Sequence, residues 1–341
     1  MTAQTHAGES ARLRDAVLAS ATRAICRIVE RPLAPRLSIL AFHRVLKDPD
    51  PMYPDLLDER RFDALMGIVA KVFTVLAVGE AAQRLKSGSL PPRALCVTFD
   101  DGYADNATVA MPILRKYGVV GTFFVATGFL DGGTMFNDRL IHCVRYGRSD
   151  RMAFKQWGVP VQAITTMADR RLVADALIRR CKHLPQAERE AFVREIECRL
   201  GRSPVFPALM LRSSQVVDLH RGGMEIGGHT VSHPILRSIP DAEAEAEIAA
   251  GRHALEKLID APVDVFAYPN GKLMQDYDAR HVEMVRRLGF RAAVTTAAGT
   301  ATAVSHMLEL PRFTPWDRHN LLWMTRLLRA RLAGDPGGVR A

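Results

Sequence analysis

The sequence lacks the features of secreted, membrane-spanning and disulfide-stabilised proteins. Its 341 residues contain only five cysteines, an odd number without a C-x-x-C pair, which predicts free thiols in a reducing compartment. The first ten residues are polar and contain no apolar stretch behind a basic start, so we expect no secretory signal peptide. The longest apolar runs fall well short of the ~20 residues that span a bilayer. These absences predict a cytoplasmic protein.

Nucleic-acid-binding motifs, internal repeats and low-complexity tracts are also absent. No helix-turn-helix, RNA-binding or zinc-finger pattern accompanies the net charge of +9, so we expect no nucleic-acid partner. Much of the basic excess lies near the two ends of the chain. It predicts a solvated surface, or one that faces anionic lipid or an anionic saccharide carrier. Nothing in the sequence indicates an oligomeric state.

The chain ends are expected to form helices outside the main fold. Within an N-terminal segment, residues 1–36, apolar side chains recur at helical spacing beside arginines over residues 9–31. We expect this amphipathic helix to pack on the body of the protein. The alternative is peripheral contact with the inner face of an anionic membrane. Residues 317–341 are predicted to form a C-terminal helix and tail.

Short apolar runs alternate with helical patterns between these ends. Strand, helix and strand repeated about seven times predict an α/β protein whose parallel sheet closes, or nearly closes, into a barrel over residues 37–316. Residues 137–215 break the alternation with two helical patterns, 169–182 and 186–200, and are predicted to be a helical insertion that forms part of a substrate wall. The predicted strands are 38–42, 95–99, 121–125, 225–227, 265–268, 292–295 and 308–310.

Polar residues follow several of these strands. Catalytic groups of parallel barrels collect at the carboxyl ends of the strands, so residues placed there are expected to share one rim. Chance placement would scatter them over both rims. The residues in these positions are His43, Asp100, Asp101, His229, the turn Pro269-Asn270-Gly271, and Arg312.

One carboxylate of this set, together with His229 and the nearby His233, can form a half-open metal site. Successive side chains of a strand alternate, so one of Asp100 and Asp101 can reach a metal while the other addresses a water molecule. His229 and His233 are spaced one helical turn apart and can converge on one ion. This combination predicts a metal-dependent hydrolase. A non-haem iron oxygenase uses the same ligand types and is an alternative, although such enzymes are commonly all-β.

The motifs resemble those of the polysaccharide deacetylases with a NodB-homology domain, carbohydrate esterase family four. T-F-D-D-G at 98–102 and G-H-T-V-S-H at 228–233 match the first two motifs of that family, and F-A-Y-P-N-G at 266–271 resembles the third. The resemblance covers roughly residues 36–315 apart from the insertion. It implies a distorted (β/α)7 barrel and the removal of N-acetyl groups from an amino sugar.

The resemblance also implies a role for each motif residue. Asp101, His229 and His233 would bind a divalent metal, usually zinc, and Asp100 would be the general base. A backbone N–H at Asn270, in the Pro269–Gly271 turn, would stabilise the oxyanion.

Two departures from the commoner family pattern affect the remaining roles. Ala267 stands where the usual arginine of the third motif is expected, and the late L-x-H motif is absent. Residues 40–45, L-A-F-H-R-V, instead resemble the L-x-Y-H-x-V element of the exopolysaccharide deacetylase branch. By this resemblance His43 is the general acid, and Arg312 would orient Asp100. The alternatives are that His43 is a buried core histidine and that Arg312 is a structural salt-bridge partner.

The expected substrate is an N-acetylated saccharide, either a polysaccharide or its lipid-linked precursor. Without an export signal, a cytoplasmic precursor is the more plausible of the two. A saccharide-binding module that has lost turnover is a further alternative, because the usual arginine and late histidine are missing.

Overall fold

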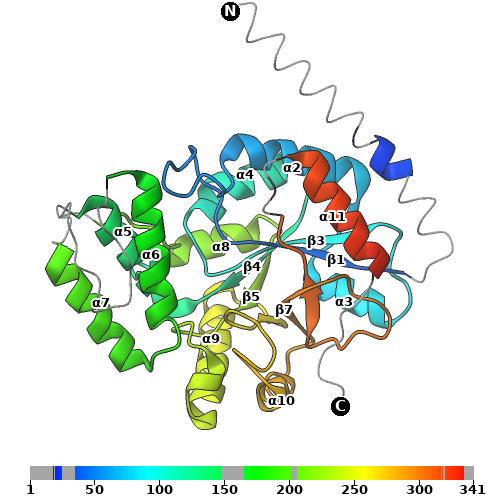
Figure 1. Cartoon of the computed structure of the whole chain (residues 1–341). Coiled ribbons are helices and arrows are strands. Elements are labelled where there is room, and N and C mark those ends of the chain that lie inside the picture. The colour runs from blue at the N-terminus through cyan, green and yellow to red at the C-terminus, as the bar shows by residue number, and fades with distance from the viewer. Residues whose placement is uncertain are drawn as a thin grey trace, which may run out of the picture.

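The structure is a computed structural model that describes residues 18, 20–24, 35–147, 165–200, 206–315, 317 and 319–333 (Figure 1). Within these residues eight strands form one sheet, and every strand pair is parallel. The strands are β1 (Ser38–Phe42), β2 (Thr74–Val75), β3 (Ala94–Phe99), β4 (Gly121–Val125), β5 (Glu225–Gly228), β6 (Val265–Ala267), β7 (Ala292–Ala298) and β8 (Leu310–Arg312).

The sheet curls into a barrel. Its strand order is β1-β3-β4-β5-β6-β7-β8, with β2 added to β3 outside this path. The segment after β8 returns to β1, where the Phe313 N–H donates to the Ile39 carbonyl at 2.7 Å and the Ala41 N–H donates to the Phe313 carbonyl at 2.9 Å. The predicted parallel barrel is therefore confirmed. The last strand was placed wrongly, because it begins at Leu310 and contains Arg312.

The two faces of the strands pack into two apolar clusters. Outward side chains such as Val97 and Phe99 lie against the surrounding helices. Inward side chains such as Ile39 and Cys96 pack with α3 (Val78–Lys86). Helix α3 closes the amino end of the barrel, so the carboxyl end is left for a site. The outer helices are α2 (Glu59–Val72), α4 (Met111–Lys116) after a π-helical turn at Asn106–Ala110, α8 (Ser213–Arg221), α9 (Asp241–Ile259), α10 (Ala279–Arg287) and α11 (Asn320–Ala333).

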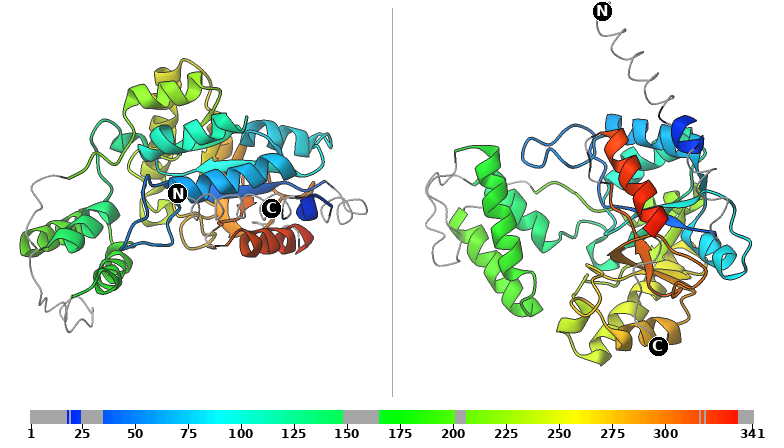
Figure 2. Two further views of the ribbon diagram at one scale, coloured as in Figure 1. Left: turned by 90° about the horizontal axis from the view of Figure 1, so that it is seen from above. Right: turned by 45° about the vertical axis from the view of Figure 1, so that its right-hand side comes forward.

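Three helices form a lobe beside the barrel: α5 (Phe136–Tyr146), α6 (Met167–Cys181) and α7 (Gln186–Leu200) (Figures 1 and 2). They share an apolar cluster of their own, which includes Leu140, Leu177 and Ile196. The two predicted insertion helices are present, whereas α5 was not predicted. We call α5–α7 the insertion lobe; the predicted domain boundaries themselves stay predictions.

Most of the predicted N-terminal amphipathic helix, residues 9–31, lies outside the described residues. Of its described part, Leu18 packs against the barrel core. At the other end, α11 buries Trp323 and Leu327 in the same core, so the expected C-terminal helix is present. No helix among the described residues has the length and apolar composition needed to cross a bilayer.

Candidate metal centre and active site

Asp100 and Asp101 leave the end of β3 in different directions. The Asp100 N–H still donates to the Phe42 carbonyl at 2.9 Å, so Asp100 continues the inward face that Cys96 and Thr98 define. At Asp101 the backbone changes to a left-handed conformation, with φ of 75°. A non-glycine residue in this region is uncommon and carries a strain cost. The Asp101 carboxylate faces His229 and His233, whereas the Asp100 carboxylate faces Arg312.

His229 and His233 lie on a loop that follows β5. The prediction of a helical turn between them is wrong, because Thr230 and His233 have left-handed φ values of 65° and 54°. The loop is held from α9, where the Glu247 carboxylate accepts the N–H groups of Val231 and Ser232 at 2.9 and 2.8 Å. The two imidazoles converge because of this irregular backbone.

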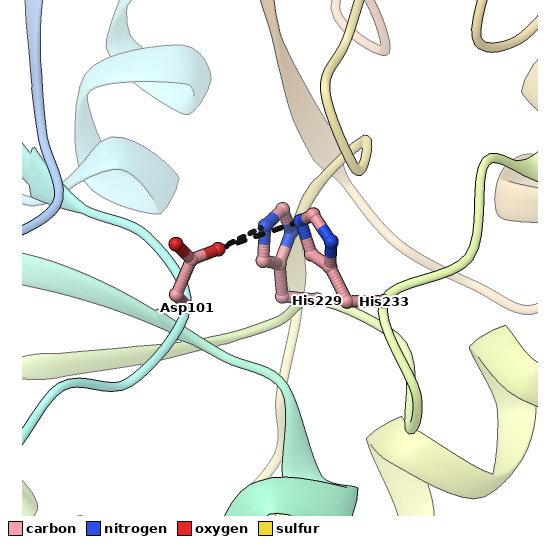
Figure 3. A group of neighbouring side chains, drawn as sticks. All are labelled: Asp101, His229 and His233. Carbon is pink, nitrogen blue, oxygen red and sulfur yellow. Dashed lines mark ion pairs between the residues drawn. The ribbon is translucent and has the colours of Figure 1, made fainter. Parts of the chain in front are cut away.

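The structure brings Asp101, His229 and His233 together (Figure 3). One Asp101 carboxylate oxygen lies 3.4 Å from Nε2 of each histidine, and one ligand atom from each residue falls within 4.8 Å of the others. Nδ1 of His229 lies 2.7 Å from the Ala267 carbonyl, which fixes the ring with Nε2 toward Asp101. Two imidazole nitrogens and one carboxylate suit a divalent cation such as zinc.

The charge states of Asp101 and His233 also fit a cation. At His229 burial would lower the pKa, but the hydrogen bond to Asp101 and the charges of Asp100 and Asp101 raise it. Burial opposes ionisation of Asp101, but the hydrogen bond to His229 and the charge of His233 hold the Asp101 pKa well below its usual value. Burial lowers the pKa of His233 to about 4, despite the nearby Asp101 carboxylate. At neutral pH Asp101 is therefore ionised and His233 is neutral. Metal coordination requires these two forms.

Arg312 pairs with Asp100 inside the barrel. The two guanidinium NH groups donate to the two carboxylate oxygens, each at 2.7 Å, and the side chains are only 1% and 4% exposed. Arg312 also donates to the Thr295 carbonyl at 2.7 Å, so its own position is fixed. Burial alone would raise the Asp100 pKa, but the charge and hydrogen bonds of Arg312 lower it. Asp100 is consequently a carboxylate held in one orientation.

His43 follows β1 and is exposed, so the alternative of a buried core histidine is wrong. It lies near enough to Asp100, Asp101 and His233 for its charge to act on the pKa of each. The turn after β6 is at the same end of the barrel. Asn270 and Gly271 have left-handed φ values of 60° and 67°, and Thr296 binds both of their carbonyls.

Several supporting residues were not found from the sequence. Glu247 and Ala267 hold the histidine loop and the His229 ring. Gly251 lets α9 approach this loop, since a Cβ there would lie 2.8 Å from the Thr230 backbone. Of these three residues, only Gly251 could have been noticed in the sequence, because a glycine inside a long helical pattern indicates a close approach of another segment. The contacts of Glu247 and Ala267 depend on tertiary packing.

A family model described as polysaccharide deacetylase matches residues 87–173 and 182–293. These residues make up more than half of the chain and include both aspartates and both histidines. The chain belongs to the polysaccharide deacetylase family. It is accordingly a deacetylase, a hydrolase, and the oxygenase and non-catalytic alternatives are set aside.

Individual relatives of this polysaccharide deacetylase are distant. The Bacillus subtilis protein YxkH, whose name describes a polysaccharide deacetylase, is 20% identical over 279 residues, which cover 81% of this chain and 70% of YxkH. The Streptococcus pyogenes deacetylase PplD, solved in complex with acetate, superposes with a TM-score of 0.58 at 19% identity and covers 87% and 99% of the two chains. IcaB from Ammonifex degensii gives a TM-score of 0.54 at 18% identity, covering 87% and 97%. The structural matches share the barrel fold.

Proposed function

We propose that this deacetylase removes N-acetyl groups from an amino sugar of a polysaccharide or its lipid-linked precursor. A divalent cation, for which zinc is the first candidate, would be held by Asp101, His229 and His233. The observation that carries the proposal is the convergence of one carboxylate and two imidazole nitrogens within 4.8 Å. A cation held there would polarise the acetamide carbonyl and acidify the attacking water.

Asp100 is assigned as the general base. Its lowered pKa keeps the carboxylate ionised at neutral pH, ready to accept the proton of the attacking water. A weakly basic carboxylate is sufficient when the water is already acidified. Arg312 is a positioning residue, because its two hydrogen bonds fix the plane of the Asp100 carboxylate. It would replace the arginine that the commoner pattern has at the position of Ala267.

His43 is assigned as the general acid that protonates the departing amine. An amide anion is too poor a leaving group to depart without this proton. The exposure of His43 and its electrostatic interaction with Asp100 and Asp101 support the assignment. We assign the backbone N–H of Asn270, between Pro269 and Gly271, to the developing oxyanion.

A cytoplasmic location is part of the proposal. Among the described residues all four cysteines are free, with Cys96, Cys143 and Cys181 buried and Cys198 exposed. Free thiols are typical of reducing compartments. Fractionation of cells that produce the full chain should find it in the cytoplasm or peripherally bound at the inner membrane face. Recovery from outside the cytoplasmic membrane would contradict this.

The test is the variant Asp100→Asn, assayed with an N-acetylated oligosaccharide and one equivalent of zinc. Loss of the base should reduce acetate release by about 10²- to 10⁴-fold, while metal content measured by elemental analysis stays near that of the wild type. Asp218→Asn, on the exposed side of α8, is the matched control and should keep full activity. Loss of metal together with activity in Asp100→Asn would overturn the role of Asp100.

A further inference from the structure

A cavity of about 550 Å³ lies between the candidate metal centre and the insertion lobe. The barrel contributes Ser232 and His233 to its lining, and His233 is also a proposed metal ligand. The insertion lobe contributes Phe136, Arg139 and Arg189, among others. The volume is within the range of sites for small molecules. A sugar at the metal centre would therefore place its neighbouring group in this cavity.

Three arginines and one glutamate carry the charge of the lining. Arg139 is neutralised, because it binds both Glu190 oxygens at 2.8 Å and also Glu197 at 2.8 and 2.9 Å. Arg194 lies 3.6 Å from the same Glu190. Glu197 is not part of the lining but pairs with Arg139, so it is counted here. The three arginines then carry three positive charges, against the two negative charges of Glu190 and Glu197. The wall of the cavity therefore carries one uncompensated positive charge.

Arg189 is the residue without an acidic partner. Its guanidinium stacks over the Phe136 ring at 4.7 Å, and it makes no ion pair within the described part of the chain. Burial lowers the pKa of Arg189, and the charge of Glu190, which is shared with Arg139 and Arg194, offsets this only in part, so the ionised side chain lacks full compensation. An anion placed beside it would supply that compensation. A planar guanidinium held on an aromatic ring is well suited to bind phosphate or carboxylate through two hydrogen bonds.

We propose that this cavity binds an anionic group of the saccharide substrate and that Arg189 is the residue that selects for it. The inference rests on the proposed deacetylase function and narrows its substrate class. The anionic group is either the phosphate of a sugar phosphate linked to a carrier or the carboxylate of a neighbouring uronic acid. Both would bring a negative charge to the Arg189 side of the cavity.

The test compares acetate release from three substrates. They are a neutral N-acetylglucosamine oligosaccharide, a nucleotide-diphosphate N-acetylglucosamine, and an oligosaccharide of alternating glucuronic acid and N-acetylglucosamine. The wild type should favour one of the two anionic substrates over the neutral one. Arg189→Gln should lower kcat/KM for that substrate by about 10- to 100-fold, as expected for loss of a charge-assisted contact, and leave the neutral substrate within about twofold. Arg180→Gln, exposed on α6, is the matched control and should change neither.

Which anionic substrate responds identifies the source of the charge. Equal losses on neutral and anionic substrates in Arg189→Gln would overturn the proposal, as would a wild type without any anionic preference. If no substrate releases acetate, the proposed function fails, but the cavity remains testable by calorimetric binding of the same three compounds to the Asp100→Asn protein. Tighter binding of an anionic compound that Arg189→Gln abolishes supports the anion site. Equal binding of all three overturns it.

Discussion

The carboxyl end of the barrel and the insertion lobe use charged residues in different ways. At the barrel, the Asp100–Arg312 pair is only 4% and 1% exposed, and four residues of the site have left-handed backbone: Asp101, Thr230, His233 and Asn270. In the lobe, Arg139 and Glu190 are 17% and 37% exposed and lie on ordinary helices. Residues with fixed, strained positions are typical of catalysis, while ion pairs on regular helices are adjustable. We infer that the barrel supplies the chemistry and the lobe selects the substrate.

The largest effect is expected from removing a proposed metal ligand. His229→Ala should weaken zinc binding by more than about 100-fold, because loss of a direct ligand exceeds the usual effect of losing a supporting contact. Equilibrium dialysis with metal analysis measures this, and acetate release should fall with it. His253→Ala, exposed on α9, should bind zinc as the wild type does. Unchanged zinc affinity in His229→Ala would place the metal elsewhere.

A large loss of stability is expected from Arg312→Met. This variant leaves the Asp100 carboxylate buried without its partner, which should lower the free energy of unfolding at pH 7 by about 3–5 kcal/mol. The pKa of Asp100 is lower in the folded protein than in the unfolded chain. The pair therefore stabilises the protein fully when the pH is above the pKa of Asp100 in the unfolded chain. This stability is lost as the pH falls through the pKa of Asp100 in the folded protein. Denaturant unfolding should therefore show the difference between wild type and variant shrinking toward acid pH.

The double variant Asp100→Asn/Arg312→Met separates charge from packing. Without the buried carboxylate it should be more stable than Arg312→Met alone. Equal stability of the two would mean that the arginine acts through its packing, and the contrast between the barrel and the lobe would lose its main support.

The lobe should respond to Leu177→Ala with a local effect. Leu177 is fully buried in the apolar cluster of the lobe, so a cavity there should cost about 2–5 kcal/mol. Hydrogen exchange should accelerate in α5–α7 while zinc affinity stays unchanged. Leu172→Ala, at a side chain 66% exposed on the same helix, is the matched control and should have little effect. Equal acceleration in β3 and β5 would show that lobe and barrel unfold together.

The smallest effect is expected at Asp138, where the lobe meets the barrel. Tyr103 donates to its carboxylate at 3.1 Å, and burial raises the Asp138 pKa to about 6. The folded protein thus binds this proton more tightly than the unfolded chain, so stability falls as the pH rises from about 4 to 6. Asp138→Asn avoids this loss and should be more stable than wild type by up to about 3 kcal/mol at pH 8. Denaturant unfolding with a chelator present should show the advantage vanishing at pH 4, and an advantage independent of pH would contradict the assignment.

Much of the barrel and the composition of the site could be predicted from the sequence. The strand of residues 95–99 is apolar, and polar residues follow it directly. The parallel alternation therefore predicted Asp100 and Asp101 at the carboxyl end of the barrel. Strand β2 could not be found because two residues, Thr74 and Val75, carry no periodicity. The prediction of a helical turn for His229 and His233 was wrong, because their spacing alone does not distinguish a helix from a loop with left-handed residues.

The resemblance paired Arg312 with Asp100, but no local pattern in the sequence could predict the geometry of that pair or the other contacts of the site residues. Arg312 lies 212 positions from Asp100, and only the closed barrel brings the two together. The same holds for the contact of Glu247, on α9, with the histidine loop and for the cavity at Arg189. Each contact joins segments that no local pattern in the sequence connects.

The position of Arg312 on the final strand has a consequence during protein synthesis. A nascent chain that has left the ribosome only as far as β7 holds every proposed metal ligand, but it lacks Arg312 beside Asp100 and Phe313 between Ile39 and Ala41. Both the contact that joins β8 to β1 and the guanidinium that pairs with Asp100 come from this last segment. We therefore expect a chain that ends before β8 to be unable to hold the Asp100 carboxylate in its orientation, because the guanidinium that fixes it is missing.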